Sequence, residues 1–140
     1  MNRPSVPTNS PPNRAHVLVA EDTPTILRLL GKVLTRAGYR VTLTKDGEEA
    51  IRTHAEQPDD FDLLILDIML PKRTGEEVLD AVRLTSPGIA ALFTTGLGEE
   101  ALSQELRNNG VIEIVQKPWN SVTILEAVKN ALDQKRNANP

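Results

Sequence analysis

Cysteine is absent from this chain of 140 residues. Its absence excludes disulfide bonds, thiolate zinc sites, iron–sulfur clusters and cysteine nucleophiles together. A chain without cysteine also fits a reducing compartment, where disulfides are rare. No apolar run approaches the roughly 18 residues that a membrane span needs, and the first residues lack the apolar core of a signal peptide. We therefore expect a cytoplasmic protein with no membrane insertion.

Aromatic residues are scarce as well, since the chain holds one Trp, one Tyr and two Phe. These are too few to form a platform on which nucleobases stack. Neither sign of charge dominates, because 16 Lys and Arg stand against 19 Asp and Glu, giving a formal charge of -3. Surfaces that bind nucleic acid are usually basic. The composition therefore argues against a nucleic-acid partner.

The length and the 39% of hydrophobic residues suffice for one domain with a real core. Residues 1–14 hold four prolines and no acid, a composition that cannot bury apolar surface, so we predict a disordered arm or linker there. The last residues, 135–140, are predicted to be a frayed tail. The predicted folded domain is residues 15–134.

Between the two ends, apolar runs typical of strands alternate with apolar residues at helical spacing. The five predicted strands are short and largely apolar: 16–20, 39–44, 61–66, 89–94 and 111–115. Five predicted helices follow them: one between a cap at Asp22 or Thr23 and a stop at Gly38, then 48–57, 75–85, 99–109 and 120–133. In the last helix, the spacing predicts that Val122, Leu125, Val128 and Leu132 face inward. This alternation predicts an α/β fold with a parallel sheet covered on both faces.

Polar side chains follow four of the predicted strands. Glu21 and Asp22 come after the first, Asp67 after the third, Thr95 after the fourth and Lys117 after the fifth. In open parallel sheets, sites lie beyond the carboxyl ends of the strands. Three carboxylates there repel one another unless a cation intervenes, and Mg²⁺ prefers oxygen ligands. The set suits phosphoryl transfer, with Asp67 as candidate nucleophile, because a carboxylate can form an acyl phosphate.

Each of these residues taken alone has a simpler interpretation. A lone Asp after a strand most often forms a turn or caps a helix, and Glu21 with Asp22 fits the cap of the first helix. Thr95 alone fits a turn, and Lys117 alone fits a solvated charge. The evidence for chemistry is the whole set, because one reaction needs these residue types and they follow the strands in chain order.

The motifs around these residues resemble the receiver domains of bacterial two-component response regulators, often called CheY-like. The resemblance covers about residues 15–133 and rests on HVLVAED, LLILDIMLPKRTG, LFTTG and IVQKPW. Pro71 and Gly75 stand four and eight residues after Asp67, as they do in that family. The resemblance implies a doubly wound sheet with strand order 2-1-3-4-5. The sequence LFTTG…GVIEIVQKPW is most similar to that of receivers of hybrid histidine kinases.

The resemblance also implies roles for the acidic residues. Asp67 corresponds to the aspartate that accepts a phosphoryl group from a histidine of a partner kinase. Glu21 and Asp22 correspond to the acidic pair that holds Mg²⁺ together with that aspartate. The backbone carbonyl of Met69 is implied as a further metal ligand.

The hydroxyl and the ammonium have implied roles as well. Thr95 corresponds to the residue that binds a phosphoryl oxygen, and Lys117 to the lysine that pairs with the phosphorylated aspartate. The Lys117-Pro118 peptide resembles the family's cis peptide, a geometry that a non-proline residue would hold only at high cost.

Two features depart from the family or modify it. Ile114 stands where the family usually has Tyr or Phe, so we hypothesise a changed or weaker shift of the face formed by the fourth helix, the fifth strand and the fifth helix. Met69 and Leu97 place two apolar side chains at the predicted pocket mouth. Neither can position an attacking water, so we predict slow spontaneous loss of phosphate.

The resemblance implies a phosphoacceptor signalling domain, which modifies only itself and is in that sense not an enzyme. Its implied partners are a histidine kinase or phosphotransfer protein and a downstream protein. Two alternatives stay open: a phosphorylation-independent adaptor, and an aspartate-based phosphohydrolase, although such enzymes commonly carry a second Asp where Met69 stands. The sequence also leaves open whether the domain is free-standing or part of a hybrid kinase, and whether it forms a homodimer.

Overall fold

Five parallel strands form one sheet in the order β2-β1-β3-β4-β5. They are β1 (His16–Ala20), β2 (Arg40–Thr44), β3 (Leu63–Asp67), β4 (Ala90–Thr95) and β5 (Glu113–Gln116). The computed structural model describes residues 15–96, 104 and 113–137. The predicted α/β fold and its strand order are confirmed, and every strand boundary lies within two residues of the predicted one.

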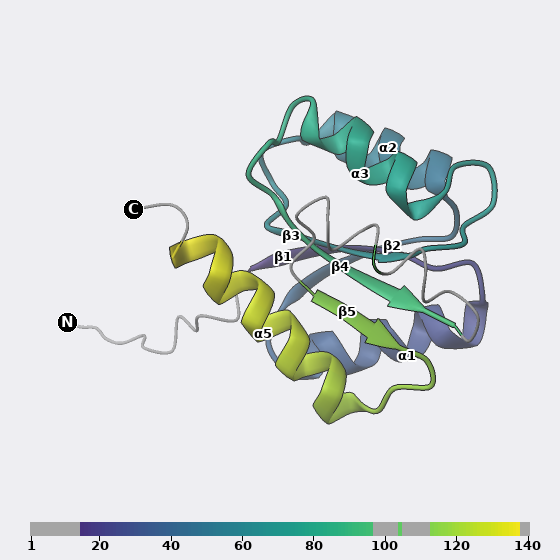
Figure 1. The fold of residues 1–140 in the computed structure, drawn as a ribbon, viewed down its shortest axis with the longest axis vertical. Helices are drawn as coiled ribbons and strands as arrows, with labels where there is room; N and C mark the ends of the chain where they lie inside the picture. Colours follow the sequence, from purple (N-terminus) through teal and green to yellow (C-terminus); the bar gives the residue numbers. More distant parts are fainter. Residues whose placement is uncertain (1–14, 97–103, 105–112, 138–140) are drawn as a thin grey trace.

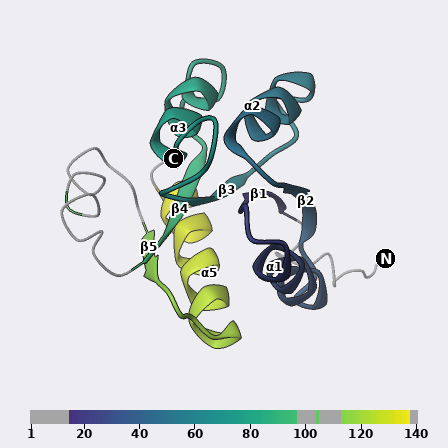
Figure 2. The ribbon, with the colours of Figure 1, turned by 90° about the vertical axis from the view of Figure 1, so that its right-hand side faces the viewer.

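Four helices lie within the described ranges: α1 (Pro24–Arg36), α2 (Gly47–Glu56), α3 (Gly75–Arg83) and α5 (Ser121–Asn137). Helices α1 and α5 cover one face of the sheet, and α2 and α3 cover the other (Figures 1 and 2). Of the helix predicted over 99–109, only Gln104 is described, in helical conformation. The predicted arm, 1–14, lies outside the described residues.

Two apolar layers hold the helices against the sheet. Phe93 and Val78 belong to the cluster on the α2 and α3 side, while Leu34 and Val128 belong to the cluster on the α1 and α5 side. All residues of β1 and β3 are buried. Strands covered on both faces are apolar throughout, which is why these strands were visible in the sequence as unbroken runs.

Helix α5 departs from the sequence prediction in two ways. It runs to Asn137 rather than ending at 133, because Gln, Lys and Arg favour helix and no proline follows before Pro140. Its predicted inward residue Val122 is 64% exposed, and Ile124 is fully buried instead. The helix carries two overlapping apolar sets, and packing against β4 and β5 selects the one that includes Ile124.

Candidate functional site

The five residues singled out in the sequence meet at one edge of the sheet. Glu21 and Asp22 directly follow β1, Asp67 ends β3, Thr95 ends β4, and Lys117 directly follows β5. In the register of the sheet, Asp67 lies opposite Thr94 and Thr95 lies opposite Gln116. Parallel strands carry all their carboxyl ends to the same edge, so the five residues lie along one edge of the sheet. Side-chain contacts bring together Glu21, Asp22, Asp67 and Lys117.

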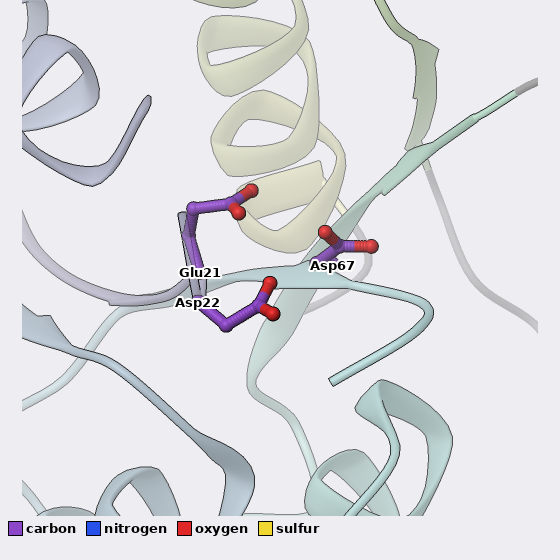
Figure 3. A group of neighbouring side chains, drawn as sticks. All are labelled: Glu21, Asp22 and Asp67. Carbon is purple, nitrogen blue, oxygen red and sulfur yellow. The ribbon is translucent and has the colours of Figure 1, made fainter. Parts of the chain in front are cut away.

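Three carboxylates form an acidic cluster at this edge. One oxygen from each of Glu21, Asp22 and Asp67 lies within 4.8 Å of the others, and Figure 3 shows all three carboxylates pointing toward a shared space. Glu21 and Asp67 are buried, whereas Asp22 is exposed. Hard oxygen donors with one side open to solvent match the preference of Mg²⁺, which keeps several waters. The cluster could therefore hold such a metal ion.

Glu21 has an unusual electrostatic environment for a carboxylate. Burial raises its pKa, and the nearby charge of Asp67 adds to that effect. The backbone N–H of Thr23 donates to Glu21 Oε2 over 2.9 Å, and this bond together with Lys117 opposes the rise. The net pKa lies above the ordinary value. A cation bound among the three carboxylates would favour the charged form that burial disfavours.

Both carboxylate oxygens of Asp67 accept hydrogen bonds. Lys117 Nζ donates to Oδ2 over 2.5 Å, and the backbone N–H of Met69 donates to Oδ1 over 3.1 Å. Lys117 Nζ also lies 3.4 Å from Glu21 Oε1. Burial alone would lower the pKa of Lys117, but the hydrogen bond and charge of Asp67, joined by Glu21, outweigh it and raise the pKa. Lys117 therefore stays a cation beside the aspartate.

Thr95 connects β4 to the lysine. It is buried, and its carbonyl oxygen accepts a hydrogen bond from the backbone N–H of Lys117 over 2.7 Å. The Lys117-Pro118 peptide bond is cis, as the sequence motif led us to expect. The role predicted for the Thr95 hydroxyl stays a prediction.

Two glycines support the loop that follows Asp67. A Cβ at Gly75 would lie 2.4 Å from the carbonyl oxygen of Asp67, and one at Gly47 would lie 2.2 Å from that of Arg73. The N–H of Gly47 donates to the carbonyl of Pro71 over 3.3 Å. The motif around Asp67 had singled out Gly75, but the sequence analysis gave no role to Gly47.

The structure describes two of the three residues that set this chain apart in the sequence analysis, Met69 and Ile114. Met69 is 56% exposed, and its N–H donates to Asp67 Oδ1. Its predicted place at the pocket mouth and the metal ligation predicted for its carbonyl stay predictions. Ile114 is half-buried and packs against the α2 and α3 cluster. It lies opposite Phe93 in the sheet. Leu97 lies outside the described residues.

Comparisons with known proteins agree with this geometry. The response regulator receiver domain family matches residues 17–129 of the chain. Among the residues that the structure describes, no helix combines the length and the apolar character that a membrane crossing requires.

Curated relatives carry a similar stretch within proteins of very different length. Hybrid signal transduction histidine kinase D of Dictyostelium discoideum is 33% identical over 127 residues, which is 89% of this chain but 8% of that protein. The alkaline phosphatase synthesis transcriptional regulatory protein PhoP of Bacillus subtilis is 35% identical over 89% of the chain and 51% of its own length. Chemotaxis protein CheY of Treponema pallidum is 28% identical over 91% and 90%.

Solved structures show the same fold. A response regulator receiver domain protein from Clostridium thermocellum superposes with a TM-score of 0.83 and 27% identity, covering 89% of this chain and 98% of its own. Against hybrid kinase D the present chain spans a small part of the relative, and against CheY it spans nearly all. The shared unit is therefore the stretch containing the acidic cluster and Lys117.

Proposed function

The chain belongs to the response regulator receiver domain family, and from that premise we propose that it accepts a phosphoryl group on Asp67. The observation that carries the proposal is the environment of that carboxylate. Asp67 ends a buried strand, receives hydrogen bonds from Lys117 and Met69, and lies within 4.8 Å of two further acids. A positioned nucleophile beside an ammonium and a site for a cation is what phosphoryl transfer requires.

The donor in this proposal is a phosphohistidine of a histidine kinase or a phosphotransfer protein. An oxygen of Asp67 forms the new bond to phosphorus while the bond from phosphorus to the histidine nitrogen breaks. Glu21, Asp22 and Asp67 would hold Mg²⁺, which when bound offsets charge on the phosphoryl oxygens. The ammonium of Lys117 is the second positive charge near those oxygens. Thr95 would offer its hydroxyl to one of them.

The product of this step is the chain itself with a new charge at its rim. A phosphoryl group adds negative charge and acceptor oxygens. The surrounding loops then shift between two conformations, and a downstream protein binds one of them. On this proposal the chain modifies only itself and turns over no small-molecule substrate. The exposed Met69, with no acid or amide to orient water, fits a phosphorylated state that decays slowly.

Two other functions for the same fold make different predictions. An aspartate-based phosphohydrolase needs an acid or base beside the nucleophile, and the residue two positions after Asp67 is the thioether Met69. An adaptor that works without phosphorylation needs none of the contacts around Asp67. An adaptor does not need three carboxylates gathered beside the ammonium of Lys117, so we favour the phosphoacceptor.

The test measures the intact mass of the protein after incubation with Mg²⁺ and acetyl phosphate. We expect the mass to rise by one phosphoryl group in the wild type and in Asp80→Asn, which removes an exposed acid of α3. We expect no rise in Asp67→Asn or without the metal. If the folded wild type gains nothing from acetyl phosphate and nothing from a phosphorylated kinase, the adaptor function replaces this proposal.

A further inference from the structure

A strongly basic segment follows Glu21 and Asp22 in the chain. Residues 23–45, which span α1 and β2, hold five of the chain's sixteen lysines and arginines and none of its nineteen acids. The chain as a whole carries a formal charge of -3. This segment is therefore a local positive surface on an acidic protein.

Three of these cations form a row along α1. Arg28, Lys32 and Arg36 follow one another at intervals of four residues, a spacing that places side chains on one face of a helix. All three are exposed, and within the part of the chain that the structure describes none of them forms an ion pair with an acid. Their charge is consequently available to a partner.

An apolar groove runs beside this row. Its volume is about 550 Å³, and its lining includes Gly31 of α1 together with Val41 and Leu43 of β2. Leu43 is 39% exposed, which is high for a leucine of a sheet. Gly31 keeps the groove open, because a Cβ there would lie 3.0 Å from Leu43 Cδ1. The groove thus combines an aliphatic floor with a cationic rim.

The groove also lies at an open border of the sheet. Strand β2 is the first strand in the order β2-β1-β3-β4-β5 and pairs only with β1 within that sheet. Figure 2 shows β2 at the edge with α1 beside it. An approaching chain meets no neighbouring strand there, and edge strands are recurrent sites of peptide recognition.

We propose that this groove binds an acidic segment of a partner protein that also carries apolar side chains. The apolar side chains would cover Val41 and Leu43, since contiguous exposed apolar surface commonly marks an interaction site. Acidic side chains of the partner would pair with Arg28, Lys32 and Arg36, because complementary charge steers association and fixes the register.

Other anionic partners match the groove less well. A nucleic acid would engage the cations but leave the aliphatic floor without an apolar contact, and the groove lining contains no aromatic side chain on which a base could stack. Proteins that bind an anionic bilayer usually do so through an amphipathic surface, whose apolar face inserts between the lipid headgroups. Here the apolar residues form the floor of a groove below the cations, which a single polypeptide segment can enter.

This proposal is independent of phosphoacceptance, because the groove is lined by none of the residues proposed to act there: Glu21, Asp22, Asp67, Thr95 and Lys117. The test is a selection of short random peptides displayed on phage against the full chain. We expect the enriched peptides to be rich in Asp and Glu and to contain aliphatic or aromatic residues. Titration with one such peptide should move the backbone amide resonances of α1 and β2.

Three variants assign that binding to the groove. Arg28→Glu with Lys32→Glu should weaken the selected peptide by about tenfold or more, as expected when two complementary charges become repulsive. The matched pair Arg52→Glu with Lys129→Glu makes the same change in net charge at exposed positions of α2 and α5 and should bind as the wild type does. Leu43→Gln should weaken binding while leaving every charge in place. Circular dichroism checks that each variant is folded.

Several outcomes would overturn the proposal. The proposal is wrong if the selection does not enrich acidic peptides. It is also wrong if the enriched peptides bind the Arg28→Glu/Lys32→Glu variant as tightly as the Arg52→Glu/Lys129→Glu variant. The same chain is tested with vesicles of phosphatidylcholine and phosphatidylserine and with a DNA duplex. If the vesicles or the duplex bind the chain, and this binding depends on Arg28 and Lys32 but not on Leu43, the surface recognises that anion and the peptide proposal is wrong.

Discussion

At the residue scale, the backbone of the phosphoacceptor candidate is fixed by a neighbour that has no side chain. Gly75 lies against the carbonyl oxygen of Asp67 and the ring of Phe93, and an added Cβ would lie 2.4 Å and 2.9 Å from them. Gly75→Ala must displace β3 or α3, so we expect it to destabilise the protein by about 1–3 kcal/mol.

Denaturant unfolding followed by circular dichroism measures that loss, and the chain offers a matched control. Gly88 has no atom within 4 Å of the position that its Cβ would take. Gly88→Ala should therefore leave the free energy of unfolding nearly unchanged. Equal midpoints for the two variants would show that the close approach at Gly75 relaxes without cost.

His54 is a second residue whose effect can be measured. It is buried, and its Nε2 lies 2.9 Å from Ser86 Oγ. Because Ser86 gives its own proton to the carbonyl of Pro58, Nε2 of His54 is the donor in that contact. Burial lowers the pKa of His54, and the charge of Asp59 only partly opposes this effect. The folded protein therefore favours the neutral ring.

A lowered histidine pKa makes stability fall on acidification. Above the ordinary pKa of about 6.5 neither the folded nor the unfolded ring is protonated, and the contribution of His54 is intact. Below that value the unfolded chain binds the proton more readily, so the free energy of unfolding decreases as the pH falls. We expect unfolding between pH 8 and pH 5 to show this slope and His54→Gln to reduce it. An unchanged slope in the variant would contradict the assignment.

Individual residues also show which parts of the site could be predicted from the sequence. Asp67 and Lys117 were predicted because the end of a strand fixes where a side chain lies, and strands are visible as apolar runs. The contact between Gly47 and the Arg73 carbonyl could not be predicted. It joins the first residue of α2 to the loop before α3, and their approach depends on the packing of α2 against α3, which no local pattern encodes.

At the element scale, the helix after the phosphoacceptor loop begins with a complete capping box. Thr74 Oγ1 accepts a hydrogen bond from the N–H of Glu77 over 3.2 Å, and Glu77 Oε1 accepts one from the N–H of Thr74 over 2.9 Å. Removing the hydroxyl leaves the Glu77 N–H without its partner. We expect Thr74→Ala to cost about 1 kcal/mol of stability.

Helix α1 supplies the control for that measurement. Thr23, one of the two caps that the sequence allowed, is its N-cap residue, but its side chain makes no capping hydrogen bond. Glu21 instead accepts the backbone N–H of Thr23. Thr23→Ala should consequently change the unfolding midpoint much less than Thr74→Ala. A similar loss in both variants would mean that helix propensity, not the cap, sets the effect.

Helix boundaries and faces were harder to predict than strand positions. The strands β1 and β3 are buried on both sides, so their residues are apolar except for His16 and Asp67 at the strand ends. The apolar run therefore locates each strand in the sequence. Helix α5 has apolar residues at more positions than its buried stripe uses. Both Val122 and Ile124 fit a helical spacing, and the contact with the sheet alone decides between them.

At the scale of the whole molecule, the acidic cluster should couple stability to divalent cations. Glu21, Asp22 and Asp67 bring three carboxylates within 4.8 Å, and the repulsion between Asp67 and the other two arises only when folding brings them together. Mg²⁺ that binds the folded state should raise the thermal midpoint, by an amount equivalent to about 2.7 kcal/mol at a hundredfold excess over its Kd.

Thermal unfolding at increasing MgCl₂ measures this effect. Asp22→Asn should remove most of the rise, and it should raise the stability without metal because one repelling charge is lost. Asp80→Asn, at an exposed position of α3, should respond to Mg²⁺ as the wild type does. Equal responses in all three proteins would place any bound metal elsewhere.

The extent of the conformational response is also a property of the whole molecule. Ile114 packs against the α2 and α3 cluster and lies opposite Phe93 on β4, two residues before Thr95 in that strand. An aliphatic side chain has no polar end that gains from moving into solvent. Its inward packing is favoured with or without a phosphoryl group on Asp67, so phosphorylation provides little differential free energy to shift it.

We therefore expect phosphorylation to move backbone amide resonances near Asp67 and Lys117 while leaving most of α5 unchanged. A tyrosine at this position has an apolar ring and a hydroxyl that prefers water, so two arrangements of similar free energy become available to it. Ile114→Tyr should accordingly extend the changes along β5 and into α5, whereas the aliphatic control Ile114→Val should behave as the wild type. Widespread shifts through α5 in the phosphorylated wild type would mean that the response travels without an aromatic side chain at residue 114.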